Sequence, residues 1–365
     1  MKFKKIIKKY FSPLSCICMI FAVVSAGLLV TSKLSPYFAD WFNYNISSFC
    51  RLIISKITGV LPFSLGEAAF LSLPLFLIVS LIVYFKVCYN DEVKSGRFVV
   101  SMVSFLCAMF TSFVFMFGTG YYGTPLADKL GLNVMPVSYD DLEHTAVRLV
   151  EVIEGVIDDV DYRYDGVSQM PYSFGELNDK LNDAYIVFAE KNPIIPELRS
   201  NVKILAVSPI MTYTHISGVF TYYTGEANIN VNYPDYSLPY TMAHEMAHQR
   251  GVAPENEANF IAFLVCMESD DPYIRYSGAM SMFEYVLSAM HKASPEDYRA
   301  FLADTDLRIK GEMIGFSKFF DRYRDSVASK VTDTINDAYL KANGEKSGSQ
   351  SYGLVVDLAC AYYAD

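Results

Sequence analysis

Three long apolar stretches near the amino terminus constrain the fold of this chain more than any other feature. Residues 13–33 carry no charge before the terminal Lys33, residues 64–85 carry only Glu67, and residues 98–117 carry none. A helix needs about 20 apolar residues to cross a hydrocarbon core of roughly 30 Å. The sequence therefore predicts three transmembrane helices and a membrane domain over residues 1–118.

The first apolar stretch has an alternative interpretation as a secretory signal peptide, because a basic segment precedes it. We favour a membrane span, since the stretch exceeds the usual apolar core of about 7–15 residues and no small-residue cleavage pattern follows it. Basic residues crowd the segment before the first span and the segment between the second and third spans. The positive-inside rule then predicts a multi-pass cell-membrane protein whose amino terminus is cytoplasmic and whose residues 119–365 are extracytoplasmic.

The net charge indicates which classes of partner to expect, and the cysteines indicate whether a disulfide is expected. The net charge is −10, and no stripe of basic residues interrupts the acidic carboxy-terminal part. Nucleic acid is therefore excluded as an expected ligand, and the lipid bilayer is an expected partner. Only Cys266 and Cys360 lie in the carboxy-terminal part; a bridge between them is one reading, and two buried apolar thiols is the favoured one.

Residues 119–365 are predicted to form one mainly helical domain. Apolar residues recur at helical spacing in 140–159, in 174–190 and in several segments after Pro239. Between residues 201 and 232 the chain is rich in β-branched and aromatic residues and is broken by Gly218 and Gly225, which predicts short strands and a turn. The expected fold is mainly α, with three transmembrane helices followed by an α+β domain that contains a small sheet.

The segment TMAHEMAHQRGVAPENEANF, residues 241–260, contains the pattern HExxH. Two histidines four positions apart lie on the same face of a helix, so His244 and His248 can reach one Zn²⁺ ion. Glu245 is offset around the helix, where it can act as a general base toward water at the open position of the metal. The alternative is a polar helix that carries this pattern by chance.

A catalytic zinc ion usually takes three protein ligands, and two glutamates compete for the third position. Glu255 follows His248 by seven residues, and Asn259 lies one helical turn further on. Glu257 points about 200° away from Glu255 on a helix, so only one of the two can face the metal. Glu255 is the favoured ligand, with Asn259 as a second-shell partner of a histidine.

HEMAH followed by ENEAN resembles the gluzincins, the zincin metallopeptidases with a glutamate as third ligand. The three spans, YYTGEANIN, LPYTMAHEMAHQRG, ENEANF and SYGLVVDLACAYY together resemble a family of bacterial membrane proteins known as DUF3810. The resemblance implies a zincin-like catalytic domain with a zinc cofactor. In this chain the third ligand lies closer to HExxH than in most gluzincins. If the connection is too short for Glu255, then Glu257 or a residue from elsewhere completes the set.

The resemblance to zincins also implies an edge strand that pairs with an extended substrate. Thr224–Asn232 is similar to that element, with Glu226 and Asn228 as its candidate substrate residues; Glu226 has the alternative role of a surface acid. His215, Tyr222 and Tyr223 are candidate donors to the oxyanion, and Tyr223 and His215 enter the expected catalytic set with Glu245.

The expected function is zinc-dependent hydrolysis of a peptide bond in a peptide or protein substrate outside the cytoplasm. The alternative is a membrane sensor or peptide-binding scaffold with a structural zinc site. The sequence leaves the substrate and the oligomeric state open.

Overall fold

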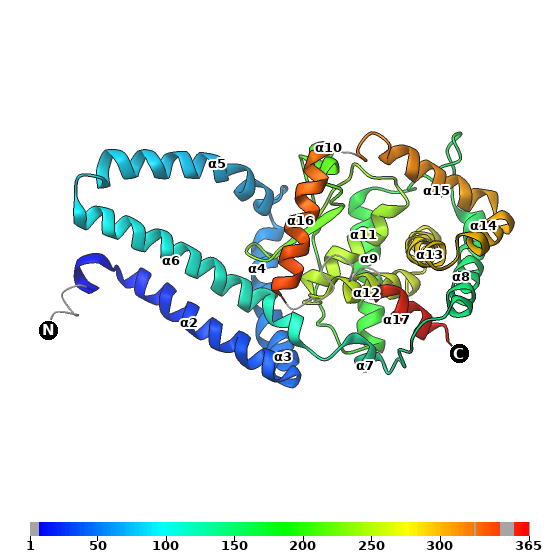
Figure 1. Cartoon of the computed structure of the whole chain (residues 1–365), viewed down its shortest axis with the longest axis horizontal. Coiled ribbons are helices and arrows are strands. Elements are labelled where there is room, and N and C mark those ends of the chain that lie inside the picture. The colour runs from blue at the N-terminus through cyan, green and yellow to red at the C-terminus, as the bar shows by residue number, and fades with distance from the viewer. Residues whose placement is uncertain (1–6, 325, 344–353, 365) are drawn as a thin grey trace. The chain divides into compact units, whose positions relative to one another are not determined.

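The computed structural model describes residues 7–324, 326–343 and 354–364, and the chain divides into two compact units (Figure 1). The first unit consists of residues 1–123 together with the hairpin tip Thr221–Gly225, and the second of Thr124–Phe220 and Glu226–Asp365. The expected boundary fell after residue 118, whereas the division lies after Gly123. The hairpin tip is far from the rest of the first unit in sequence, so patterns along the chain could not assign it.

The first unit is helical. Its elements are α2 (Pro13–Leu34), α3 (Pro36–Trp41), η1 (Phe42–Ser47), α4 (Ser48–Gly59), α5 (Leu65–Val83), η2 (Tyr84–Cys88), α6 (Glu92–Met116) and η3 (Gly118–Tyr122). Three continuous helical segments are long and apolar enough to cross a membrane, namely Pro13–Leu34, Leu65–Cys88 and Glu92–Met116. The third begins at Glu92 and not at the predicted Phe98, because the Asp91 side chain caps the helix by accepting from Val93 and Lys94 N–H.

The second unit is mainly helical. Its helices are α7 (Leu126–Leu130), α8 (Tyr139–Glu154), η4 (Ile157–Asp159), α9 (Phe174–Lys191), α10 (Ser208–Met211), η5 (Thr212–Thr214), α11 (Ser237–Gln249), α12 (Glu255–Met267), α13 (Pro272–Ala293), α14 (Pro295–Asp304), α15 (Leu307–Phe320), α16 (Val327–Ala342) and α17 (Leu354–Tyr362). Capping boxes at Ser138–Asp141 and Ser173–Glu176 begin α8 and α9.

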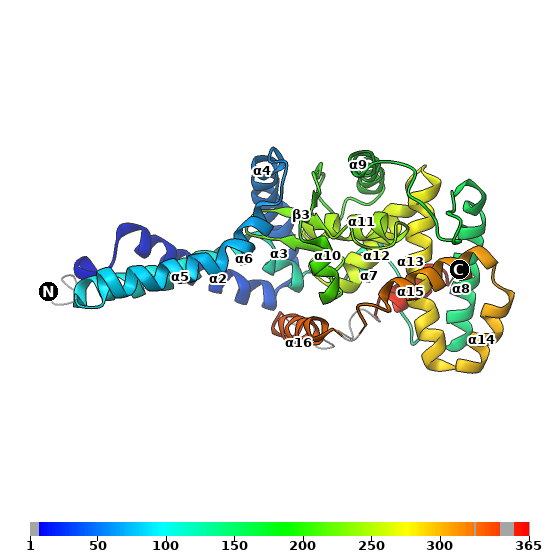
Figure 2. The ribbon, with the colours of Figure 1, turned by 90° about the horizontal axis from the view of Figure 1, so that it is seen from above.

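A three-stranded mixed sheet completes this unit. Its strands are β1 (Lys203–Ile204), β2 (Gly218–Thr221) and β3 (Glu226–Ile229), in the order β1-β3-β2. β1 runs parallel to β3, whereas β2 and β3 form a hairpin. β3 packs on α11, and Figure 2 shows the two elements together.

The strand order corrects one expectation. Thr224–Asn232 was expected to be an edge strand that pairs with substrate, but its regular part, β3, lies between β1 and β2. Both of its edges are therefore already paired. Among the described strands, β1 and β2 are the outer ones. β2 begins directly after Ser217, and its residue Val219 is 37% exposed.

The core of the second unit surrounds α11, α12 and α13. α11 and α12 pack against each other, and α13 packs against α8, α11 and α12. Nearly every side chain of α11 is buried, including apolar residues on all sides of the helix. Cys266 and Cys360 are both free and buried, in line with the favoured reading. The helix that carries the HExxH pattern is thus held by packing on most of its surface.

Candidate metal centre

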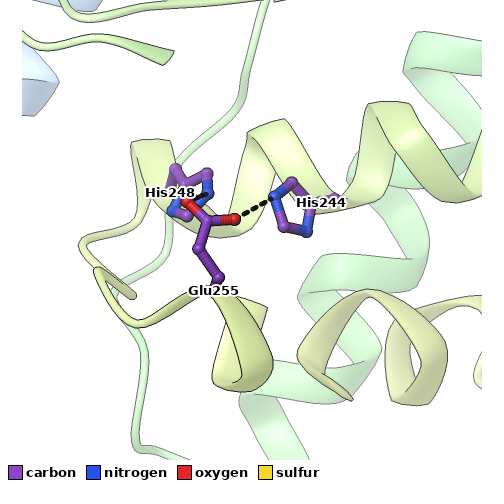
Figure 3. Close-up of side chains that lie close together, drawn as sticks. All are labelled: His244, His248 and Glu255. Atoms are coloured by element: carbon purple, nitrogen blue, oxygen red, sulfur yellow. Dashed lines mark ion pairs between the residues drawn. The ribbon is translucent and has the colours of Figure 1, made fainter. Parts of the chain in front are cut away.

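The two histidines of the HExxH pattern lie one above the other on α11 (Figure 3). Their ring centroids are 4.5 Å apart and their planes are nearly perpendicular, at 89°. His248 is buried and His244 is nearly so. This arrangement follows from the 3.6-residue repeat, which places residues i and i+4 on one face.

Glu255, the first residue of α12, closes the group. Its carboxylate oxygens lie 3.3 Å from His244 Nε2 and 3.6 Å from His248 Nε2 (Figure 3). One donor atom from each of the three residues lies within 4.8 Å of the others. We call these three residues the His–Glu cluster. It is the arrangement in which one cation can contact all three side chains.

A glycine turn brings Glu255 back toward α11. Gly251 has a φ of +97°, a conformation that side-chain-bearing residues rarely adopt. Val252 N–H donates to Ala247 O at 3.2 Å, which folds the chain back across the end of α11. The connection that appeared short in the sequence is therefore long enough for Glu255.

Glu257 lies elsewhere. Its Oε1 accepts from Leu126 N–H at 2.9 Å, at the start of α7. The offset of two positions on α12 points the two carboxylates in different directions, as expected from the helical repeat. The structure thus brings Glu255, and not Glu257, to the two histidines.

Neighbouring groups orient the imidazoles. His248 Nδ1 lies 2.7 Å from Val252 O, and we assign the proton to Nδ1 because a carbonyl can only accept. Nε2 of His248 then faces Glu255, and it is the nitrogen that could bind a cation once His248 loses its second proton. The Asn259 side chain is buried near His244 and favours its protonated form, but His244 Nδ1 and Asn259 Nδ2 have no hydrogen-bond partner within the described residues, so the role of Asn259 as a second-shell partner stays a prediction.

Burial and mutual charge set the protonation of the cluster. Burial alone would raise the pKa of Glu255, but His248 and His244 hold it well below its usual range. Burial lowers the pKa of His248, yet the Glu255 carboxylate outweighs this and raises it to about 9. Burial and the charge of His248 together lower the pKa of His244. Glu255 is therefore an ionised carboxylate paired with a protonated His248 and a neutral His244, and a cation that bound here would replace the second proton of His248.

Glu245 is a buried acid beside the cluster. It is 4% exposed, and burial raises its pKa to about 8, opposed by His248 and reinforced by Glu255. Its Oε2 has no hydrogen-bond partner within the described part of the chain. A buried oxygen without a hydrogen bond destabilises the fold unless a ligand or a water molecule donates to it.

A buried polar network holds the carboxy-terminal half of α11. Tyr185 Oη donates to Ala243 O at 2.6 Å, and the Arg250 guanidinium stacks on the Tyr185 ring at 3.8 Å. Arg250 also donates to Met246 O and Ser200 Oγ, at 3.0 and 2.9 Å. These contacts fix the backbone on which His244 and His248 stand.

The other expected site residues have different surroundings. His215 Nε2 pairs with Tyr323 O at 2.9 Å and its ring packs edge-on against Phe320. Tyr223 belongs to the first unit, where its hydroxyl donates to Gly66 O at 3.2 Å. His215 is not part of the His–Glu cluster, and Tyr223 belongs to the other unit of the chain.

The two expected substrate residues lie inside the sheet. Glu226 is 2% exposed, and its charge opposes the burial-induced lowering of the pKa of Lys203 on β1. Asn228 is fully buried and its Nδ2 donates to Val219 O and Glu226 O, at 2.9 and 3.0 Å. These contacts give both residues structural roles at the centre of the sheet.

One residue near the cluster carried no signal in the sequence. Tyr285 on α13 has its pKa raised by burial and then by the negative charges of Glu255 and Glu284, and it also interacts with Asn259. Thirty positions separate it from Glu255, and the chain has 27 tyrosines. Only the packing of α13 on α12 distinguishes it from the others.

The residues present fit a zinc ion. Two imidazole nitrogens and one carboxylate oxygen are the donor types that zinc prefers, and a set of three protein donors is typical of its catalytic sites. Because Nδ1 of His248 is bonded to Val252 O, Nε2 is the nitrogen that would bind the ion, and the buried Glu245 Oε2 has no hydrogen-bond partner within the described residues.

The comparisons with known proteins extend over most of the chain but bring no activity. A family model described as "Protein of unknown function (DUF3810)" matches residues 42–360. No curated protein and no solved structure matches the chain.

Proposed function

The chain belongs to the DUF3810 family, and from the geometry of its His–Glu cluster we propose that it is a membrane-anchored, zinc-dependent peptidase. The observation that carries the proposal is the convergence of His244, His248 and Glu255 beside the buried carboxylate of Glu245. Three protein donors leave one coordination position for water or substrate, as catalytic zinc sites do.

In this proposal zinc, when bound, would polarise the carbonyl of the scissile bond and acidify a water molecule. Glu245 would accept the proton of that water and deliver it to the leaving amine. The hydrogen bond from His248 Nδ1 to Val252 O would orient the ring so that Nε2, deprotonated when zinc binds, is the ligand nitrogen.

The strand β2 and the residue Tyr285 also have roles in the proposal. β2 is one of the two outer strands of the described sheet, and pairing of an extended peptide with such a strand would supply main-chain hydrogen bonds. Tyr285 replaces the expected His215 and Tyr223 as the candidate donor to the oxyanion, because the negative charge of Glu255 acts on its hydroxyl.

The membrane context narrows the setting. The three segments that can span a bilayer, together with the basic residues around them, support an extracytoplasmic position for the second unit. The substrates would then be peptides or protein segments outside the cytoplasm, and the lipid bilayer would be the anchoring partner.

Glu245→Gln tests the proposal. The full-length chain in lipid nanodiscs is loaded with zinc and incubated with a library of internally quenched octapeptides. Wild type should cleave members of the library, and Glu245→Gln should lose about 10²–10⁴-fold in rate, the usual contribution of a general base. Both proteins should contain the same amount of zinc by mass spectrometry.

The matched control is Glu197→Gln, which removes an exposed acid. It should cleave at the wild-type rate. Full activity in Glu245→Gln would exclude Glu245 as the base, and bound zinc without any cleavage by wild type would favour the non-catalytic scaffold.

A further inference from the structure

Gly218, the first residue of β2, lies directly against Glu245. A Cβ atom added at Gly218 would come within 2.5 Å of Glu245 Oε1, 2.6 Å of Cγ and 2.8 Å of Cδ. These separations are far inside the ordinary contact distance between heavy atoms. Any residue larger than glycine therefore needs space that the Glu245 side chain now occupies.

The strand cannot easily withdraw to provide that space. On one side of Gly218, Asn228 Nδ2 donates to Val219 O at 2.9 Å. On the other side, Asn230 N–H donates to Ser217 O at 2.9 Å, and Asn230 Nδ2 donates to Ile216 O at 3.0 Å. Both asparagines are fully buried, so hydrogen bonds from Asn228 on β3 and from Asn230 directly after β3 fix the backbone on both sides of Gly218.

The flexible partner in this contact is the Glu245 side chain. Because its Cγ, Cδ and Oε1 all face Gly218, an added methyl group displaces the whole outer part of the side chain and not one oxygen alone. Glu245 is 4% exposed and has little room to turn into solvent. Displacement must then change the direction of the carboxylate relative to the His–Glu cluster.

We propose that Gly218 is a positioning residue that sets the carboxylate of Glu245 beside the His–Glu cluster, with Asn228 and Asn230 as the struts that hold it there. The inference rests on the proposed peptidase function. It also gives Asn228 and Asn230 a structural role in place of substrate binding. They fix the backbone of the segment that contacts the Glu245 side chain.

Gly218→Ala in the full-length chain is the first test. We expect zinc content and melting temperature close to wild type, with kcat lowered about 100-fold and KM changed by less than about threefold for the best-cleaved library peptide, as for a misplaced general base. The matched control is Gly175→Ala, where the added Cβ meets only Ser173 Oγ at 3.9 Å. It should cleave as wild type does.

The double variant Gly218→Ala with Glu245→Asp is the second test. Aspartate is one methylene shorter and leaves space for the alanine methyl group. The two losses should therefore be strongly non-additive, and the double variant should be at least as active as Glu245→Asp alone. The double variant also keeps the proposal testable if Gly218→Ala alone misfolds, because the shorter aspartate side chain relieves the clash with the alanine methyl group. Additive losses would contradict the proposed contact.

Binding of acetohydroxamate separates this inference from the proposed function. A hydroxamate chelates zinc and can donate a hydrogen bond to the neighbouring carboxylate, so its affinity reports the position of Glu245 without any cleavage. We expect about tenfold weaker binding in zinc-loaded Gly218→Ala than in wild type or Gly175→Ala, the loss of one charge-assisted hydrogen bond. That result without cleavage by wild type would reject the peptidase and retain the positioning role. Equal acetohydroxamate affinity and equal kcat in Gly218→Ala and wild type would overturn the positioning role of Gly218.

Discussion

Two glutamates two positions apart, Glu255 and Glu257, have different tasks. The first faces both histidines, and the second accepts from Leu126 N–H. Glu255→Gln should lower zinc affinity by about 100-fold or more, since even second-shell changes cost about 10–100-fold. Competition with a fluorescent zinc chelator measures this affinity in the full-length protein.

Glu257→Gln is the matched control for that measurement. It keeps a side-chain oxygen that can accept from Leu126, so zinc affinity should stay at the wild-type value. A larger loss of affinity in Glu257→Gln than in Glu255→Gln would show that Glu255 is not the third ligand.

At this scale the sequence predicted what local geometry determines. The spacing of His244 and His248 and the offset of Glu245 follow from the helical repeat alone. The sequence could not identify Gly218 or Tyr285, because each meets the site through contacts between segments distant in the chain. His215 and Tyr223 were chosen for chemical type and proximity in sequence, which do not determine where their hydrogen bonds go.

Among the elements, the turn between α11 and α12 determines where the third donor lies. Gly251→Ala places a side chain at a φ of +97° and should destabilise the protein by about 1–2 kcal/mol. Zinc affinity should fall as well, because relaxation of the turn moves Glu255. Thermal unfolding and chelator competition measure the two effects, and the helical Gly175→Ala should show neither. Unchanged zinc affinity in Gly251→Ala would mean that the turn does not position the ligand.

The sheet shows where prediction of elements from sequence stops. The strand character of 201–232 was visible in its β-branched and aromatic residues. The order β1-β3-β2 was not, because β1 pairs with β3 across more than twenty intervening residues. The strand with the most distinctive sequence, GEANIN, therefore became the centre of the sheet and not its edge.

Across the whole second unit, the partly buried Glu284 and the fully buried Glu312 link distant segments. Tyr236 Oη donates to Glu284 at 2.6 Å, and Glu312 accepts from Tyr276 Oη and Ser168 N–H, at 3.0 and 3.1 Å. Burial, reinforced by the charge of Glu312, raises the pKa of Glu284 to about 7. The network joins α13 and α15 to the segment that precedes α11.

This network makes stability depend on pH. Below the ordinary value of 4.5, Glu284 is protonated in both the folded and the unfolded chain. Between there and about 7 the unfolded chain ionises first, so the free energy of unfolding falls as pH rises. Glu284→Gln removes this penalty while Gln still accepts from Tyr236. It should be more stable than wild type at pH 8, on the order of 1–3 kcal/mol, and equally stable near pH 4.5.

Thermal unfolding of the full-length protein across this pH range measures the difference. Glu197→Gln, which changes an exposed acid, should follow the wild-type curve at every pH. A stability difference between Glu284→Gln and wild type that stays constant with pH would contradict the raised pKa of Glu284.

The three helices that are long and apolar enough to cross a membrane were the most predictable part of the molecule, because hydropathy over twenty residues is a local property. All three were placed within a few residues, apart from the amino-terminal end of α6. The division of the chain into two units was harder to predict from the sequence. Five residues of the β2–β3 hairpin belong to the first unit, and no pattern along the chain indicates this assignment.

The cluster of His244, His248 and Glu255 is built from one helix, one glycine turn and the first residue of the next helix. Closing so short a loop costs little chain entropy compared with joining distant segments. The geometry of the His–Glu cluster needs only local contacts, whereas the sheet needs the long-range pairing of β1 with β3. If zinc binds as proposed, its availability during synthesis would then influence how fast the second unit reaches its native state, and not only what it does afterwards.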